Sequence, residues 1–220
     1  MMDMNFGSGK SGNGNVVEET RNISGDFTEI SASEGLNVLV TQGEGFNIRV
    51  EADENIIDLI GTDISEGRLK VHALKNIGRG TKNVYVTLPK IESLSSSSGA
   101  DLVVQNVIKA DNLELKATSG SDLRVELQAI EVTAHTSSGA DLKISGTADT
   151  LNAHASSGSD LEAQDLEVKV CFAEASSGSD IAVRVSESLK AEANSGGDIS
   201  YAGDPTVETT HSVSGSVHKD

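Results

Sequence analysis

The chain has 220 residues and a formal net charge of −17 at pH 7. Hydrophobic residues make up 36% of it and aromatic residues only 3%, with no Trp. Such an acidic chain is a poor partner for nucleic acid, whose phosphates are neutralised by Lys and Arg, and for an anionic membrane surface. Its core must be built from Leu, Ile, Val and Ala, which suits thin stacked layers better than a bulky globule.

The residues alone leave the compartment open. A single cysteine, Cys171, excludes an internal disulfide. No apolar run approaches the roughly 20 residues that span a bilayer. Residues 1–15 are rich in Gly, Ser and Asn and lack the apolar core of a signal peptide. The protein is therefore expected to be either cytosolic or a trimmed form of an exported one.

The first part of the chain is rich in predicted strands but does not repeat. Residues 1–20 are expected to be a flexible lead-in. Alternating apolar residues predict strands across 27–52, with a hairpin turn at Gly43-Glu44-Gly45, and further strands at 68–73 and 83–88. Residues 53–60 form the one helix-like stretch, with Asp53 as N-cap and Gly61 as its end. We expect residues 21–91 to be the N-terminal cap of a solenoid.

Six copies of Ser-Gly-X-Asp follow at nearly constant spacing. Their aspartates lie 18 to 21 residues apart, and a seventh copy at 214–217 has Val in place of Asp. Self-similarity at this period is typical of a solenoid, in which each repeat buries its apolar edge against its neighbours. The six aspartates are Asp101, Asp122, Asp141, Asp160, Asp180 and Asp198.

Aligning the copies on their glycines reveals apolar columns on both sides of the turn. One column, three residues after each glycine, contains Leu123, Leu142 and Leu161; another, seven before, contains Cys171. Apolar residues at odd offsets with polar residues between them indicate two strands in each repeat. The fold class is therefore all-β: a parallel β-helix over residues 92–220, with about 19–20 residues per rung, continuous with the cap. Cys171 is expected to be a buried, inert thiol.

Specific motifs resemble one bacterial family. Residues 12–30, Gly35-Leu36-Asn37-Val38, residues 51–55 and the serial Ser-Gly-Ser-Asp-Leu turns are similar to head-GIN-domain proteins, described as adhesin heads of autotransporters. The likeness covers nearly the whole chain, with Leu36 where the Gly-Ile-Asn signature has Ile. It implies a right-handed β-helix and an exported protein of the periplasm or cell surface, commonly from Bacteroidetes. It brings no catalytic residues.

The aspartate column needs something to offset its charge. Unit charges about 4.8 Å apart repel by roughly 0.9 kcal/mol in water. We expect each aspartate to cap backbone N–H groups of its own turn. The alternative is cation binding, for which Asp122, Asp141 and Asp160 are the candidates, although calcium sites are denser in oxygen ligands.

A second outward column holds histidines. It lies four residues before each glycine and places His135, His154 and Glu174 on consecutive rungs. Two histidines and a carboxylate form a zinc-like set, but parallel stacking sets these side chains side by side. We therefore expect solvated side chains, no metal and no cofactor. A third column, Arg124, Lys143 and Glu162, is expected to be a charge ladder that contributes solubility.

The resulting hypothesis is a non-catalytic binding, adhesion-like or scaffold module of the bacterial envelope, whose ligand is a glycan or a protein. The alternative is a β-helix that binds or cleaves polysaccharide, which needs carboxylates flanking a bond and usually aromatic platforms. Here Tyr85 and Tyr201 are the only tyrosines. An open solenoid end also predicts a homo-oligomer, formed through the C-terminal end or a flat outer face.

Overall fold

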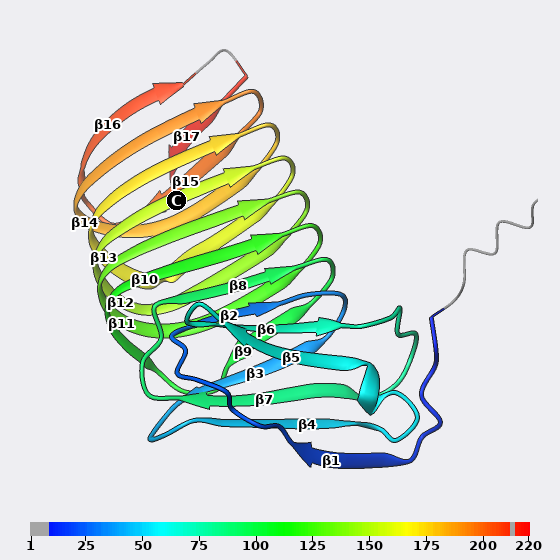
Figure 1. Cartoon of the computed structure of the whole chain (residues 1–220). Helices are drawn as coiled ribbons and strands as arrows, with labels where there is room; N and C mark the ends of the chain where they lie inside the picture. Colours follow the sequence, from blue (N-terminus) through cyan, green and yellow to red (C-terminus); the bar gives the residue numbers. More distant parts are fainter. Residues whose placement is uncertain (1–8, 212–213) are drawn as a thin grey trace, which may run out of the picture.

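A computed structural model describes residues 9–211 and 214–220, and over these residues the protein is a β-solenoid (Figure 1). One 3-10 turn, η1 (Ile57–Leu59), interrupts the strands. The strands are β1 (Val16–Thr20), β2 (Glu29–Ala32), β3 (Asn37–Gln42), β4 (Asn47–Asp53), β5 (Ile60–Ser65), β6 (Arg68–Ala73), β7 (Lys82–Leu88), β8 (Ser93–Ser97), β9 (Asp101–Val104), β10 (Ile108–Thr118), β11 (Asp122–Ser137), β12 (Asp141–Ser156), β13 (Asp160–Ser176), β14 (Asp180–Asn194), β15 (Asp198–Ala202), β16 (Thr206–His211) and β17 (Ser216–Lys219).

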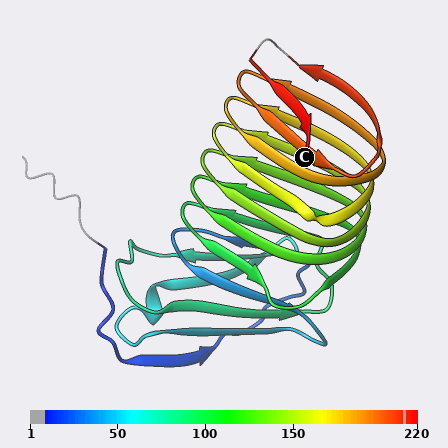
Figure 2. The same ribbon diagram turned by 180° about the vertical axis from the view of Figure 1, so that it is seen from behind.

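The repeats stack in register as the sequence predicts. Strands β8 to β17 pair parallel with their counterparts in the next rung, and Leu123, Leu142 and Leu161 are register partners, each at most 1% exposed. Each of the six Ser-Gly-X-Asp copies is a corner between two strands. The opposite side of each rung is a rounded bend, through which β11 to β14 run without interruption (Figure 2). The parallel β-helix is thus confirmed.

The corners are held by two consecutive residues in the left-handed region of backbone space. Ser157 and Gly158 have φ of 58° and 64°, and the other five copies have the same signs. Positive φ at both central residues is typical of a type I′ turn, which glycine and small polar residues tolerate. The turn leaves Asp at the first strand position after it, where period-2 alternation points it outward.

The X position of the corner faces the interior and is always a small residue: Ala in two copies, Ser in three and Gly in the last. Ser121 Oγ lies 2.9 Å from Ser96 Oγ, and Ser159 Oγ donates to Thr136 Oγ1 at 2.9 Å; each pair joins neighbouring rungs. All four of these side chains are nearly fully buried. Buried hydroxyls are tolerated only when hydrogen-bonded, and each serine at this position finds a partner in the neighbouring rung: Ser179 donates to the backbone oxygen of Ala155 at 2.8 Å.

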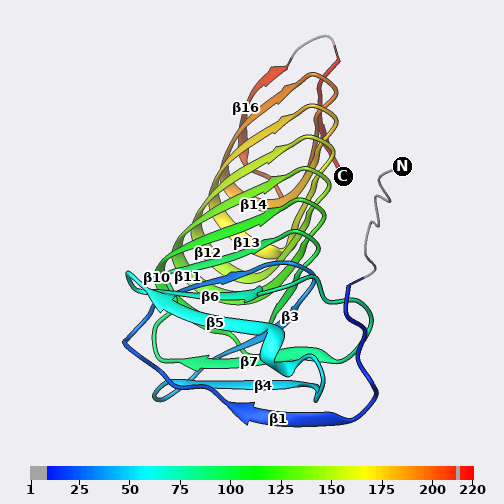
Figure 3. The same ribbon diagram turned by 45° about the vertical axis from the view of Figure 1, so that its right-hand side comes forward.

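The N-terminal part contains rung-like strands as well as a separate antiparallel layer. Strands β2 and β3 pair parallel with β8 and β9, directly below the first repeat. Below them, β4 lies antiparallel between β1 and β7, and β5 pairs antiparallel with β6. This layer forms the base of the solenoid (Figure 3).

Three local expectations for this part are wrong. Residues 53–60 form no α-helix but the end of β4 and the short turn η1. The strands before and after Gly43-Glu44-Gly45 do not form a hairpin, because β7 lies between them, parallel to β3 and antiparallel to β4. Of the expected flexible lead-in, residues 1–8 lie outside the described residues, whereas residues 16–20 form β1.

Asp53 explains how the start of the chain is held. Its side chain is 2% exposed and accepts hydrogen bonds from the backbone N–H groups of Gly14 and Thr81, each at 2.8 Å. A Cβ built on Gly12 would lie 1.8 Å from Asp53 Oδ2, so only glycine allows this approach. Asp53 therefore ties the segment before β1 to the segment before β7, a role unrelated to the expected helix cap.

Candidate functional site

The aspartate column is a continuous outward ladder on the face that follows the corners. Each of its aspartates is a register partner of the next, so the sequence prediction of stacking is confirmed. The column continues downward through Asn37, which pairs with Asp101, to Asn83. These two asparagines were not predicted as part of the column, although Glu34-Gly35-Leu36-Asn37 has the pattern of the later corners with Glu in place of Ser and Asn in place of Asp.

Partial burial and proximity make three carboxyls of the ladder less acidic. The pKa values of Asp101, Asp141 and Asp160 are raised, first by burial and then by the neighbouring aspartates. Loss of solvent and a like charge both disfavour the ionised form. Neighbouring carboxylates of the ladder therefore repel one another along this face of the protein.

The expected capping role belongs to serine. Within the described ranges, no ladder aspartate accepts a hydrogen bond from a backbone N–H of its own turn. Instead Ser121, Ser159 and Ser179 accept from the backbone N–H three residues earlier, at 3.1, 3.3 and 3.0 Å. The backbone N–H of each ladder aspartate bonds to the rung before, as in Asp141 N to Ser121 O at 3.0 Å. The hypothesis that the aspartates cap their turns was wrong, because the serine at the X position points inward beneath the turn and reaches the backbone N–H, whereas the aspartate points outward.

The histidine column is assembled on the other face, before the corners. The rings of His135 and His154 are stacked, with centroids 4.9 Å apart, and His154 Nδ1 lies 3.2 Å from Glu174 Oε2. Burial, and next the neighbouring His154, lower the pKa of His135. Over residues 9–211 and 214–220, no three His, Cys, Asp or Glu side chains are arranged to hold a metal ion. Asp122, Asp141 and Asp160 follow one another along their ladder on the opposite face.

The third column forms ion pairs between and within rungs. Lys143 Nζ lies 3.2 Å from Glu162 Oε2, and Arg124 Nη2 lies 3.4 Å from Asp122 Oδ1. Both pairs are largely exposed, so each contributes little to stability. Inside the solenoid, Cys171 is 0% exposed and burial raises its pKa to about 12, which confirms the prediction of a buried thiol.

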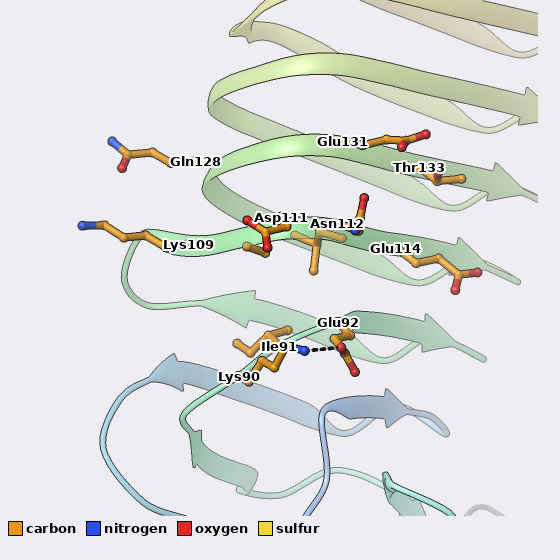
Figure 4. A pocket seen from close by; sticks show the side chains of 12 residues that line it. Lys90, Ile91, Glu92, Lys109, Asp111, Asn112, Glu114, Gln128, Glu131 and Thr133 are labelled. Atoms are coloured by element: carbon orange, nitrogen blue, oxygen red, sulfur yellow. Dashed lines mark hydrogen bonds and ion pairs between the residues drawn. The ribbon is translucent and has the colours of Figure 1, made fainter.

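A groove of about 850 Å³ lies where the base meets the repeats, and no motif in the sequence predicted it. Figure 4 shows side chains from three successive levels of the chain facing it: Lys90 and Glu92, then Asp111, Asn112 and Glu114, then Glu131 and Thr133. Ile91 and Leu113 are its buried apolar residues. These residues come from positions about 40 apart in the sequence, and only the stacking of successive rungs brings them together in one groove.

Hydrogen bonds fix several of the groove's polar groups. Lys90 Nζ and Thr28 Oγ1 donate to Glu92 at 2.5 and 2.6 Å, and these bonds lower the pKa of Glu92. Asn152 Nδ2 donates to Glu131 Oε1 at 2.9 Å. The groove therefore presents the carboxylates of Glu92 and Glu131 in fixed positions around a small apolar floor, with the amides of Asn112 and Gln128 also in its lining.

A second groove, of about 630 Å³, lies on the bend side of the upper rungs. Its lining combines the buried Ala148, Val168 and Val185 with charged side chains, among them Asp149 and Lys169, whose charged atoms are 2.7 Å apart. No helix in the described part of the chain is long and apolar enough to cross a membrane.

These features define a class of protein: a parallel β-helix that displays columns of like polar side chains on its outer faces. Residues 26–205 match the family model described as "Putative auto-transporter adhesin, head GIN domain". The chain belongs to the head GIN domain family, which confirms the resemblance noted from its motifs.

Several solved structures with the same fold come from species of Bacteroides and Parabacteroides. The chain is similar to a putative adhesin from Bacteroides fragilis, with a TM-score of 0.88 and 20% identity over 96% of this chain and 100% of that one. It is also similar to a putative lipid binding protein from Parabacteroides distasonis (TM-score 0.79, 19% identity, 96% and 98% coverage). A third is a putative adhesin from Parabacteroides merdae (0.75, 19%, 97% and 100%). No curated protein matches the sequence.

Proposed function

We propose that this protein is a non-catalytic binding module exported to the bacterial envelope, where it contacts a glycan or protein ligand through its outer surface. One observation carries the proposal: the outward side chains repeat at the rung spacing, so a ligand with repeated groups can contact several rungs at once. Repeated weak contacts within one complex add up to useful avidity. Membership of a family described as adhesins, and relatives named as adhesins, support the same role.

The groove at the base of the solenoid is the best-formed place for such contacts. Carboxylates held by hydrogen bonds, as at Glu92 and Glu131, together with the amides of Asn112 and Gln128, suit the hydroxyl groups of sugars. The lowered pKa of Glu92 is the opposite of what a general acid in glycoside cleavage requires, because that acid must stay protonated near neutral pH. Glu92 is therefore poorly suited to act as that acid, which supports binding by this carboxylate.

Binding can be tested with the full chain on arrays of bacterial and host glycans and of extracellular matrix proteins. The paired variants are Asn112→Ala with Glu131→Ala in the groove, and Glu187→Ala on the bend as a matched control. We expect the groove variant to lose most binding and the control to keep it. A chain that binds nothing on either array, or whose binding is unaffected by the groove variant, contradicts this assignment.

The polysaccharide-cleaving alternative rests on the four carboxylates of the same groove, Glu92, Asp111, Glu114 and Glu131. Incubation with a panel of polysaccharides and measurement of new reducing ends or unsaturated uronic acid distinguishes it. Turnover that disappears in Glu131→Gln would replace the binding proposal with an enzymatic one.

A further inference from the structure

The strand β1 is an open edge at the base of the solenoid. Among the described residues it pairs only with β4, antiparallel, with Val17 opposite Ala52 and Glu19 opposite Val50. The flanking bonds, Glu54 N to Asn15 O and Arg21 N to Ile48 O, show that the odd-numbered residues direct their backbone groups to β4. Alternation along an antiparallel strand therefore directs the N–H and C=O groups of residues 16, 18 and 20 to the free edge.

This edge lacks most of the usual protection against pairing. Edge strands are normally blunted by charged side chains, above all lysine, by proline or by bulges. The sequence of β1, VVEET, has no lysine or proline, its register with β4 is unbroken, and its only charges are Glu18 and Glu19. Val16 and Val17 are 48% and 37% exposed, and only a few other large apolar side chains in the described part of the chain are exposed to this degree. At the other end of the solenoid, β17 carries Lys219, which pairs with Asp204 at 2.5 Å.

Charge also favours the base as the contact between two copies. Residues 1–91 hold nine Lys or Arg and 13 Asp or Glu, whereas residues 92–220 hold eight and 21. The two carboxylates of β1 are compensated, Glu18 by Arg49 and Glu19 by Arg21. Two copies that meet at their bases thus bring together the least acidic parts of a strongly acidic protein.

We propose that β1 pairs antiparallel with β1 of a second copy across a twofold axis, which extends the sheet from β4 through β1 into the partner. The axis passes at Glu18, so that Glu18 exchanges both backbone hydrogen bonds with the partner's Glu18, and Val16 does so with the partner's Thr20. This dimer is independent of the ligand proposed above, and it differs from the sequence expectation of contact through the C-terminal end or an outer face.

The pairing leaves both solenoids free. The interface uses only the base, so the outer columns and the corners of the two copies stay exposed and extend away from a shared centre. A five-residue strand pair is far smaller than a standard interface, and the dimer is therefore weak, with a dissociation constant between about 1 µM and 1 mM.

Sedimentation equilibrium of the full chain across that concentration range tests the proposal. We expect the wild type to dimerise reversibly and Glu18→Pro to stay monomeric, because proline removes one N–H from the free edge and none from the bonds to β4. The matched control Glu18→Ala keeps that N–H and removes the contact between like charges, so it should dimerise at least as tightly as the wild type.

Val16→Lys is a second, independent block of the edge, and thermal melting shows whether each variant is folded. If Glu18→Pro fails to fold, Val16→Lys decides. A wild type that is monomeric throughout the range overturns the proposal. So does a dimer that persists in every folded edge variant, since the contact would then lie elsewhere.

Discussion

At the scale of single residues, the molecule keeps a row of like charges that its corners do not neutralise. The ladder aspartates have raised pKa values at Asp101, Asp141 and Asp160, and the hydrogen bonds that were expected to offset their charge are made by serines instead. Asp141 interacts with a like charge on each side, Asp122 and Asp160. The ladder therefore opposes folding at neutral pH, and the tightly packed columns inside must outweigh it.

Replacing Asp141 by Asn is expected to stabilise the protein at pH 7. The change removes repulsions of at most roughly 0.9 kcal/mol each in water, reduced further by salt. An increase of about 1 kcal/mol corresponds to about 2–4 °C in melting temperature for a chain of this size. Thermal melts at low ionic strength measure it. Asp26→Asn, at an exposed aspartate outside the ladder, is the control and should leave the melting temperature unchanged.

The same variant gives a pH dependence of known sign. A carboxyl whose pKa is higher in the folded state takes up a proton on folding, so stability increases as the pH falls through the raised pKa and the gain is complete below the ordinary value of 3.8. Asp141→Asn should lack its share of that gain. His135 acts oppositely, because its lowered pKa makes stability fall as the pH drops below 6.5. The comparison with wild type therefore isolates the ladder; parallel pH profiles would contradict the assignment.

Calcium is expected to change the melting temperature no more than sodium chloride of equal ionic strength. Calcium takes six to eight oxygen ligands, whereas the ladder offers one carboxylate per rung in a row. Melts at millimolar calcium, with Asp141→Asn in parallel, provide the measurement. A rise of several degrees that is specific to calcium and lost in the variant would show that the ladder binds the cation.

At the scale of the structural elements, neighbouring rungs are joined by hydrogen bonds between buried hydroxyl groups. In the base, the carboxylate of Asp53 joins the segment before β1 to the segment before β7. Ser159 pairs with Thr136 of the rung below and also accepts from the backbone N–H of Ser156. Asp53 does the equivalent for the N-terminal segment. Both are short polar side chains in dry surroundings, where a lost partner costs more than the bond itself contributes.

Ser159→Ala should destabilise the fold by about 1–3 kcal/mol, since it leaves Thr136 and the Ser156 N–H without a partner. A double-mutant cycle with Thr136→Val tests the coupling: the double variant should lose less than the sum of the single variants, because neither hydroxyl then remains unpaired. Urea denaturation measures each step. Strict additivity would mean that the two hydroxyls do not interact.

Asp53→Ala should release the segment that precedes β1. The backbone N–H groups of Gly14 and Thr81, which are only partly buried, lose their acceptor, at about 1 kcal/mol each. We expect faster hydrogen exchange across residues 10–20 and 81, and little change in the upper rungs. Glu54→Ala removes only exposed side-chain hydrogen bonds from Asn13 and Asn15 in the same segment, and it should accelerate exchange there much less. Uniformly faster exchange throughout the chain would argue against a local clamp.

At the scale of the whole molecule, the repeating features of the solenoid could be predicted from the sequence, whereas the non-repeating contacts of the base could not. The period, the corners, the interior columns and the burial of Cys171 followed from the local alternation of apolar and polar residues, because this alternation is repeated in every rung. The pairing of β1 with β4, the position of β7 between β3 and β4, and the groove depend on contacts between segments tens of residues apart. Asp53 resembled a helix cap because an acidic residue before an apolar run fits that role equally well until its neighbours are known.

The continuous interior also predicts how damage spreads. Leu142→Ala removes a fully buried side chain from the middle of its column and should cost about 2–5 kcal/mol. Because each rung contacts only its neighbours, hydrogen exchange should accelerate from the rung of Leu142 outward, with the base least affected. Equal acceleration in every rung would instead indicate a single cooperative unit.

The in-line stacking of rungs has a mechanical consequence. A pull on the C-terminal end while the base is fixed loads only the hydrogen bonds of the outermost rung, so rungs should peel off one after another instead of rupturing together. Each detached rung releases 18–21 residues of chain, or about 60–75 Å when extended. Single-molecule force spectroscopy should show a series of small, even extensions. Such a molecule absorbs a sustained load gradually and can rewind when the tension drops.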